Sequence, residues 1–111
     1  MDKDSKMTVI IVEPGLRPYL KDIPPGLKSL RREVGGKIEA TFLENGVYAI
    51  SDEFAKLTVK PLNRSLRDGT GKVFDIIAGT FLLVGVEGEH YTSLPQKLME
   101  KYISLLETEE Y

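Results

Sequence analysis

The stretch that decides the fold is residues 61–88, which read PLNRSLRDGTGKVFDIIAGTFLLVGVEG. It begins with a polar segment that carries two arginines, Arg64 and Arg67, and it ends in an almost uninterrupted apolar run from Val73 to Val86. A run this apolar must be buried on both faces, or nearly so. We therefore predict that the polar segment is a loop held at the end of a rigid core, where binding sites tend to be built.

Strand signals precede this stretch. The β-branched run 8–12 predicts a strand buried on both sides. The loosely alternating residues 17–23 predict a partner for it at a sheet edge, because a proline near their start has no N–H to donate. Asn45-Gly46 separates the runs 37–43 and 47–51, and this dipeptide between two such runs is the strongest short signal for a hairpin.

Further strands are expected around the apolar run. A brief strand is predicted over 57–60, followed by strands over 72–77 and 80–87. The last two form either one long strand bent at Ala78-Gly79 or a tight hairpin. In either arrangement Gly79 marks a bulge or a close approach of another backbone segment.

Two helices are predicted. Residues 26–34 repeat apolar side chains at helical spacing, and Gly35 and Gly36 follow as a C-terminal cap that can adopt positive φ. The second helix covers about 94–108, with Ser93 as its N-cap, a proline in its first turn and an apolar stripe along one side.

The order of these elements predicts an α+β fold. We expect a mostly antiparallel sheet of five to seven short strands, with the two helices, about 26–34 and 94–108, packed on one face. A single globular domain over 7–106 accounts for the pattern. It follows a flexible leader, 1–6, and precedes an acidic tail, 107–111, that is expected to fray.

Composition limits the classes of function. The 111 residues carry 15 basic and 17 acidic side chains, so no overall positive charge attracts the chain to nucleic acid. There is no cysteine, which excludes disulfides and thiolate zinc sites and is typical of cytoplasmic proteins. No apolar run approaches the roughly 20 residues of a membrane helix. We expect a cytoplasmic protein that binds neither a membrane nor long nucleic acid.

No constellation of catalytic or metal-ligating residues is evident. His90 is the single histidine, and without cysteine partners a solvent-exposed loop histidine is the simpler interpretation. The Gly-Thr-Gly sequence at 69–71 precedes a strand rather than a helix, so it is not a phosphate loop. We predict no metal, no cofactor and no enzymatic activity.

Two carboxylates lie in predicted strands. One is Glu39, and the other is Asp75, which interrupts the apolar run. A buried carboxylate is costly unless it is paired or hydrogen-bonded, and Arg64 and Arg67 are the candidate partners of Asp75. In one interpretation the pair orders a ligand-facing arginine, and in the other it is an internal salt bridge that holds the loop.

The predicted binding residues lie on the loop and on the first helix. Asn63 offers a donor and an acceptor suited to a base or ribose edge, and the guanidinium forks of Arg64 and Arg67 suit phosphate. A second basic patch consists of Lys28, Arg31, Arg32 and Lys37. If the two groups converge they form an anion site, and if not, each is a solvated face. The predicted ligand-binding residues are Asn63, Arg64, Arg67, Thr80, Lys28 and Arg31. Structural roles are predicted for Asp75, Gly79, Gly35, Gly36 and Glu39.

Several blocks of the sequence resemble one known family. They are VIIVEPG (9–15), GLKSLRREVGGKIEA (26–40), PLNRSLRD (61–68), DIIAGTFLLVG (75–85) and TSLPQKLMEKY (92–102). In this order, from about Met7 to Tyr102, the chain resembles Domain of Unknown Function 3846, a small family common in bacteriophages and mobile elements of Gram-positive bacteria. Residues 52–56 depart from the family's glycine-containing turn.

The resemblance implies a protein that acts by binding, by analogy with other small phage proteins. Our leading hypothesis is a non-enzymatic protein of phage or mobile-element origin that counters host defence by sequestering an anionic, nucleotide-type ligand. A chain this short has little room for an enclosed pocket, so we expect the site to form between subunits of a homo-oligomer. The alternative is an inhibitor or adaptor that binds a host protein through an edge strand or the C-terminal helix.

Overall fold

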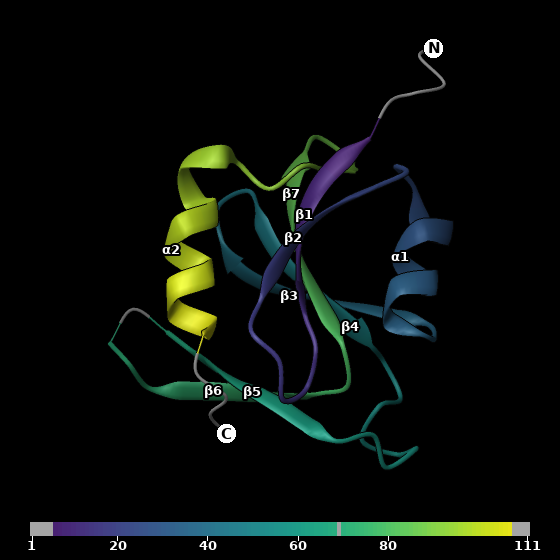
Figure 1. Cartoon of the computed structure of the whole chain (residues 1–111), viewed down its shortest axis with the longest axis vertical. Helices are drawn as coiled ribbons and strands as arrows, with labels where there is room; N and C mark the ends of the chain where they lie inside the picture. Colours follow the sequence, from purple (N-terminus) through teal and green to yellow (C-terminus); the bar gives the residue numbers. More distant parts are fainter. Residues whose placement is uncertain (1–5, 69, 108–111) are drawn as a thin grey trace.

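The computed structural model describes residues 6–68 and 70–107. Over these residues it contains eight strands and two helices, which confirms the predicted α+β class (Figure 1). In chain order they are β1 (Met7–Val12), β2 (Tyr19–Ile23), α1 (Leu27–Val34), β3 (Ile38–Glu44), β4 (Val47–Asp52), β5 (Leu62–Arg67), β6 (Val73–Ala78), β7 (Phe81–Glu87), β8 (His90–Thr92) and α2 (Gln96–Leu106).

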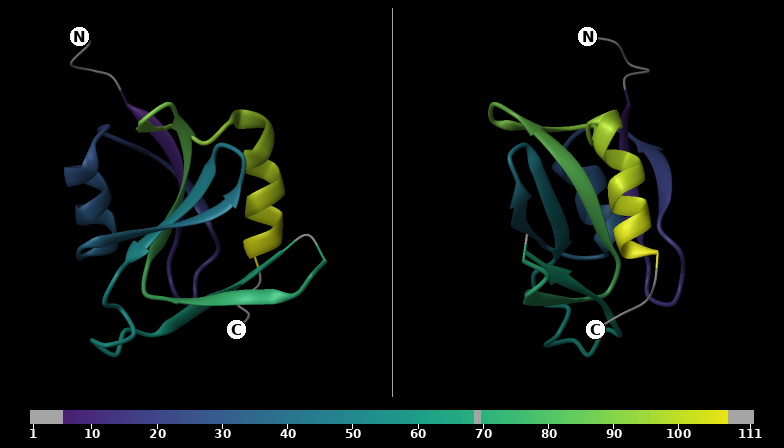
Figure 2. Two further views of the ribbon diagram at one scale, coloured as in Figure 1. Left: turned by 180° about the vertical axis from the view of Figure 1, so that it is seen from behind. Right: turned by 90° about the vertical axis from the view of Figure 1, so that its left-hand side faces the viewer.

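The strands form two sheets, and every pairing is antiparallel. The main sheet has the order β2-β1-β7-β4-β3, and the short β8 pairs with the far end of β7. β5 and β6 form a separate two-stranded sheet, which crosses below the main sheet as a long hairpin (Figures 1 and 2). β7 is therefore the centre of the fold, with neighbours on both sides.

The two helices cover opposite faces of the main sheet, so the prediction that they pack on one face is wrong (Figure 2). In β7, Leu82 and Val84 belong to the core beneath α1, whereas Phe81 and Leu83 belong to the core beneath α2. The strands β1 and β4 alternate in the same way. Because the central strands are apolar on both sides, each face has to be covered by another element.

Residues 62–67, expected to be a loop, form the strand β5. Arg64 and Leu66 face the main sheet and are buried, while Leu62 and Arg67 are exposed. The strand could not be recognised from an apolar pattern, because its buried side chains include the Asn63 amide and the Arg64 guanidinium. The apolar run is bent rather than folded back on itself: Gly79, with φ of 74°, redirects the chain from β6 into β7. Gly79 therefore adopts a backbone conformation that residues with a side chain rarely take.

Other boundaries differ from expectation. No strand forms over 57–60, where a series of turns includes Val59 at φ of 60°. The strand β8 was not predicted. Ser93 does not cap α2; its hydroxyl oxygen accepts a hydrogen bond from the Thr8 N–H at 2.8 Å and so joins the start of α2 to β1. No described helix has the length and apolar character needed to cross a membrane.

Gly85 is required by a close approach of two backbone segments. A Cβ atom added at this buried position would lie 2.2 Å from the Ser93 carbonyl oxygen. That oxygen belongs to the backbone and cannot rotate away. We expect Gly85→Ala to lower the free energy of unfolding by about 1–3 kcal/mol, the usual cost of overpacking. Urea denaturation followed by circular dichroism measures it. Gly88→Ala is the comparison: nothing lies within 4 Å of its added Cβ, so its cost reflects only a φ of 62° that disfavours any side chain, and no clash. A Gly85→Ala protein as stable as the wild type would contradict this close approach.

Candidate functional site

Asn63 lies in the interior with no exposed surface. Its side-chain amide donates to the carbonyl oxygens of Val12 at 2.9 Å and Gly79 at 2.8 Å. Its side-chain oxygen accepts from Arg64 at 2.7 Å. Asn63 therefore ties β5 to the end of β1 and to the bend before β7. The predicted role of this side chain in reading a base or ribose edge does not fit a group without accessible atoms.

Arg64 is also buried, with 2% of its surface exposed. Nε donates to the Leu106 carbonyl oxygen at 2.8 Å, and a second guanidinium nitrogen donates to the Leu16 carbonyl oxygen at 2.7 Å. The guanidinium thus connects the end of α2, the β1–β2 loop and β5. A cation also suits the C-terminal end of a helix dipole. The structure places Arg64 as a structural residue rather than as a phosphate clamp.

Arg67 and Thr80 lie apart from each other. Arg67 is exposed at the end of β5, where its guanidinium donates to the Gly71 carbonyl oxygen at 2.9 Å. Thr80 is half-buried between β6 and β7. The predicted cluster of Asn63, Arg64 and Arg67 on one loop is therefore not formed, because Asn63 and Arg64 are buried and hydrogen-bonded to each other, whereas Arg67 is exposed at the end of β5.

Asp75 does not pair with either predicted arginine. Its carboxylate lies 3.6 Å from Lys56 Nζ and accepts the Ile76 N–H at 2.8 Å. Of the other predicted structural residues, Glu39 is exposed on β3. Gly35 ends α1 in the left-handed conformation at φ of 75°, as the sequence predicts.

The sequence did not reveal an ion pair between Asp52 and Lys60. Lys60 Nζ lies 2.6 Å from the Asp52 carboxylate and also donates to the Val34 and Gly35 carbonyl oxygens at the end of α1. The hydrogen bond from Lys60 lowers the pKa of Asp52 below its usual value of 3.8. Gly36 leaves space for this carboxylate, since an added Cβ would lie 2.7 Å from its oxygen.

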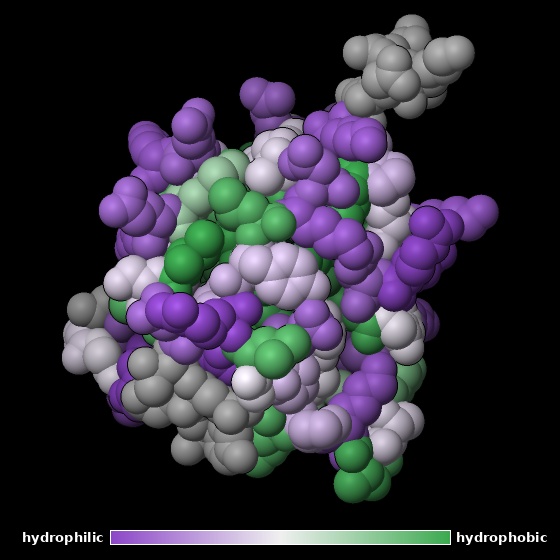
Figure 3. Space-filling model, viewed as in Figure 1, coloured by the Kyte–Doolittle hydropathy of each residue, from purple (hydrophilic) through white to green (hydrophobic). Residues whose placement is uncertain are grey.

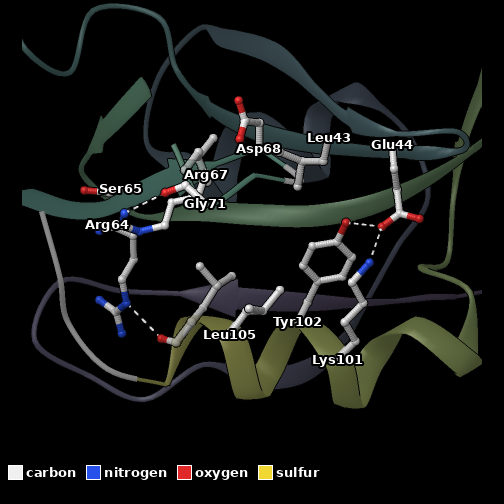
Figure 4. Close-up of a pocket in the computed structure, with 12 residues that line it drawn as sticks. Leu43, Glu44, Arg64, Ser65, Arg67, Asp68, Gly71, Lys101, Tyr102 and Leu105 are labelled. Atoms are coloured by element: carbon white, nitrogen blue, oxygen red, sulfur yellow. Dashed lines mark hydrogen bonds and ion pairs between the residues drawn. The ribbon is translucent and has the colours of Figure 1, made fainter. Parts of the chain in front are cut away.

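A groove of about 570 Å³ lies between α2 and the β5–β6 hairpin (Figure 4). Tyr102 and Leu105 project into it from α2, and Leu66 and Arg67 border it from β5. We call it the α2 groove. Its volume is within the range of roughly 300–1,000 Å³ that is typical of ligand pockets. Its lining is apolar in the centre, with charged side chains of both signs at the rim.

One end of the α2 groove is closed by a polar cluster. Glu44 accepts hydrogen bonds from the Tyr102 hydroxyl and from Lys101 Nζ, the latter at 2.9 Å. The Tyr102 bond, followed by the Lys101 bond, lowers the pKa of Glu44. Burial and then the bond to Glu44 raise the pKa of Tyr102. The groove therefore holds a carboxylate that stays ionised at neutral pH and would repel an anion near it.

A second hollow lies beside α1 and has a different character. It also measures about 570 Å³, and it is an open depression rather than a cleft. Apart from Gly36, every residue that lines it is basic: Lys28, Arg31, Arg32 and Lys37. We call it the basic hollow. Hydrophilic side chains project from this side of the molecule in Figure 3, where Figure 1 shows α1.

The four cations of the basic hollow have no acidic partner among the described residues. Elsewhere in this part of the chain Arg17, Lys21, Lys56, Lys60 and Lys101 each form an ion pair. The basic hollow lies on the α1 side of the main sheet, whereas α2 and its groove lie on the other side (Figure 2). The two predicted basic groups therefore do not converge.

Among the described residues, no group of three or more histidine, cysteine or acidic side chains could hold a metal ion. His90 is exposed at the start of β8.

Comparisons with known proteins agree with the resemblance seen in the sequence. A family model described as "Domain of unknown function (DUF3846)" matches residues 7–107. No curated protein and no solved structure matches the chain. The description of the family names no activity, so the roles of individual residues rest on the geometry above. Since the match covers nearly the whole chain, this protein belongs to the DUF3846 family.

Proposed function

We propose that this protein acts by binding and that the basic hollow holds an anionic ligand of the nucleotide type through its phosphate groups. The observation that carries the proposal is that Lys28, Arg31, Arg32 and Lys37 surround one hollow that no carboxylate lines. Four of the 15 basic side chains of this chain, whose net charge is −2, gather there. Phosphate would relieve the mutual repulsion of the four side chains and accept hydrogen bonds from each.

The proposal retains two of the predicted ligand-binding residues and gives them a larger role in binding. Lys28 and Arg31, expected to be auxiliary charges, become the main contacts to the phosphate. Asn63 and Arg64 cannot serve, because their side chains are buried and hydrogen-bonded to the backbone of this chain. No aromatic side chain lines the basic hollow, so no base can stack on an aromatic ring there. Affinity should therefore follow the number of phosphates rather than the identity of the base, and it should fall as salt is added.

The test is a thermal-shift titration with ATP, AMP and inorganic tripolyphosphate. We expect stabilisation by ATP and tripolyphosphate at millimolar concentration, with AMP weaker. The double variant Lys28→Glu/Arg31→Glu should weaken binding at least tenfold. The matched control is Lys72→Glu/Lys97→Glu, which changes the net charge equally at two exposed lysines outside the basic hollow. Absence of any stabilisation, or equal binding by both double variants, would sink the proposal.

A second candidate function is the binding of a protein through the α2 groove. The observation that favours it is the apolar lining of the groove, in which Leu105 keeps 64% of its surface exposed. An amphipathic segment of a partner could insert apolar side chains there while its charges meet the mixed rim. The variant Leu105→Glu separates the two functions, because it places a charge in the apolar lining of the α2 groove and leaves the basic hollow unchanged. This variant should abolish binding of a partner segment in the α2 groove and leave phosphate binding unchanged.

A further inference from the structure

β3 is an open edge of the main sheet. It ends the strand order on one side, and no other strand of residues 6–68 and 70–107 pairs with its outer edge. Proteins usually protect such edges with proline, lysine or a covering element. The opposite edge strand, β2, follows Pro18 and contains Lys21. β3, with the sequence IEATFLE, contains neither residue type.

The pairing of β3 with β4 shows which of its backbone groups face outward. The Glu53 N–H donates to the Lys37 carbonyl oxygen at 2.7 Å, so the backbone groups of Lys37 point toward β4. The backbone N–H and C=O groups of successive residues point alternately to the two sides of a strand. The groups of Glu39 and Thr41 therefore also point toward β4. The N–H and C=O groups of Ile38, Ala40 and Phe42 therefore point away from the sheet.

We propose that a second copy of this chain pairs with this edge, antiparallel, about a two-fold axis through Ala40. Outward-facing residues must lie opposite outward-facing residues, so Ala40 pairs with the partner's Ala40 and Ile38 pairs with the partner's Phe42. This register uses all three outward-facing residues of each copy. A slip by two residues in either direction leaves one of them unpaired.

Side chains favour the same register. Ile38, Ala40 and Phe42 lie on the face that α1 covers only in part, and Phe42 keeps 54% of its surface exposed. Pairing would bring Phe42 against the partner's Ile38 and place the small Ala40 at the axis.

The dimer goes beyond the proposed function and does not depend on it. A two-fold axis that relates antiparallel edge strands is perpendicular to the sheet, so both copies of α1 lie on one side of the joined sheet. The two basic hollows would then face the same way. Anion binding and dimer formation are measured separately, so either can fail without the other.

The first test is Ala40→Cys. The chain has no cysteine, so the new thiol has no other partner within its own subunit. Residues in a hydrogen-bonded antiparallel pair have Cα atoms about 5.5 Å apart, within the range of about 4.4–6.8 Å that a disulfide spans. We expect mild oxidation to produce a reducible covalent dimer. The matched control, Leu20→Cys, places an exposed thiol on the edge strand β2 and should stay largely monomeric.

The second test is sedimentation equilibrium of the wild type and of Ala40→Pro. The proline removes an outward N–H, and the ladder between β3 and β4 does not use that group. We expect the wild type to shift from monomer to dimer as its concentration rises, and the variant to stay monomeric with an unchanged circular dichroism spectrum. If the proline unfolds the chain, the comparison of Ala40→Cys with Leu20→Cys tests the proposal by itself. A wild type that remains monomeric, or equal cross-linking of the two cysteine variants, overturns the proposal.

Discussion

Replacing Arg64 with methionine should lower the free energy of unfolding by about 3–5 kcal/mol, the cost of breaking a buried hydrogen-bond network. The guanidinium joins the Leu106 carbonyl oxygen, the Leu16 carbonyl oxygen and the Asn63 side chain. Methionine fills part of the volume but donates no hydrogen bond. The three acceptors would keep their desolvation cost and lose the donors that offset it.

Denaturation by urea, followed by circular dichroism, measures the change. Arg17→Met is the matched control: the Arg17 side chain is 79% exposed, and its ion pair with Glu107 is worth at most about 1 kcal/mol. Arg64→Lys should recover little of the loss, because a single ammonium group cannot reach acceptors that the planar fork contacts from three directions. If Arg64→Met is as stable as Arg17→Met, the network around β5 contributes nothing to the fold.

Replacing Lys60 with methionine should lower the free energy of unfolding by about 2–3 kcal/mol, somewhat less than the 3–5 kcal/mol of a fully buried ion pair. The reduction reflects the exposure of the Lys60 side chain, which is 31%, against 6% for Asp52. Without Lys60, a buried carboxylate loses its cation. The two carbonyl oxygens at the end of α1 lose a donor as well.

The effect of Lys60→Met should depend on pH. Lys60 lowers the pKa of Asp52 in the folded protein below its usual value of 3.8, so the stabilisation is complete above that value. It is lost as the pH falls through the lower, folded pKa, because Asp52 then takes up a proton. The difference in unfolding free energy between wild type and variant should therefore be full at pH 7 and shrink below about pH 4.

Lys56→Met is the matched control for this prediction. Lys56 belongs to the same connecting segment, but its ion pair with Asp75 is longer, at 3.6 Å, and more exposed. We expect a change of less than about 1 kcal/mol with no pronounced dependence on pH. A difference between wild type and Lys60→Met that stays constant from pH 7 to pH 3 would show that the Asp52 charge is not the cause.

The sequence predicted the elements whose signals are local. Helix α1 matches its predicted span almost residue for residue, because apolar spacing and a glycine cap act within one stretch of chain. The hairpin at Asn45-Gly46 forms for the same reason. The strand over 62–67 was not predicted, since Asn63 and Arg64 point inward to partners more than 40 residues away in the sequence.

In the candidate site, too, the sequence indicated only what depends on residues close together in the chain. Lys28 and Arg31 could be grouped from the sequence because they lie on one short helix, and the short turn after it brings Lys37 to the same hollow. Arg64 was assigned to a ligand because its guanidinium fork suits phosphate, and the internal partner considered for it was Asp75. The acceptors of Arg64 come from α2 and from the β1–β2 loop, which are distant in the chain.

What the sequence by itself determined was the class of fold, the family and most of the helices and strands, because apolar periodicity and turn residues act over a few residues. Only the tertiary structure decided that the helices lie on opposite faces and that Asn63 and Arg64 hold the interior together. It also decided that β3 is left with an open edge. Each of these depends on which distant backbone groups meet, and the hydrogen-bonding capacity of a side chain does not specify its partner.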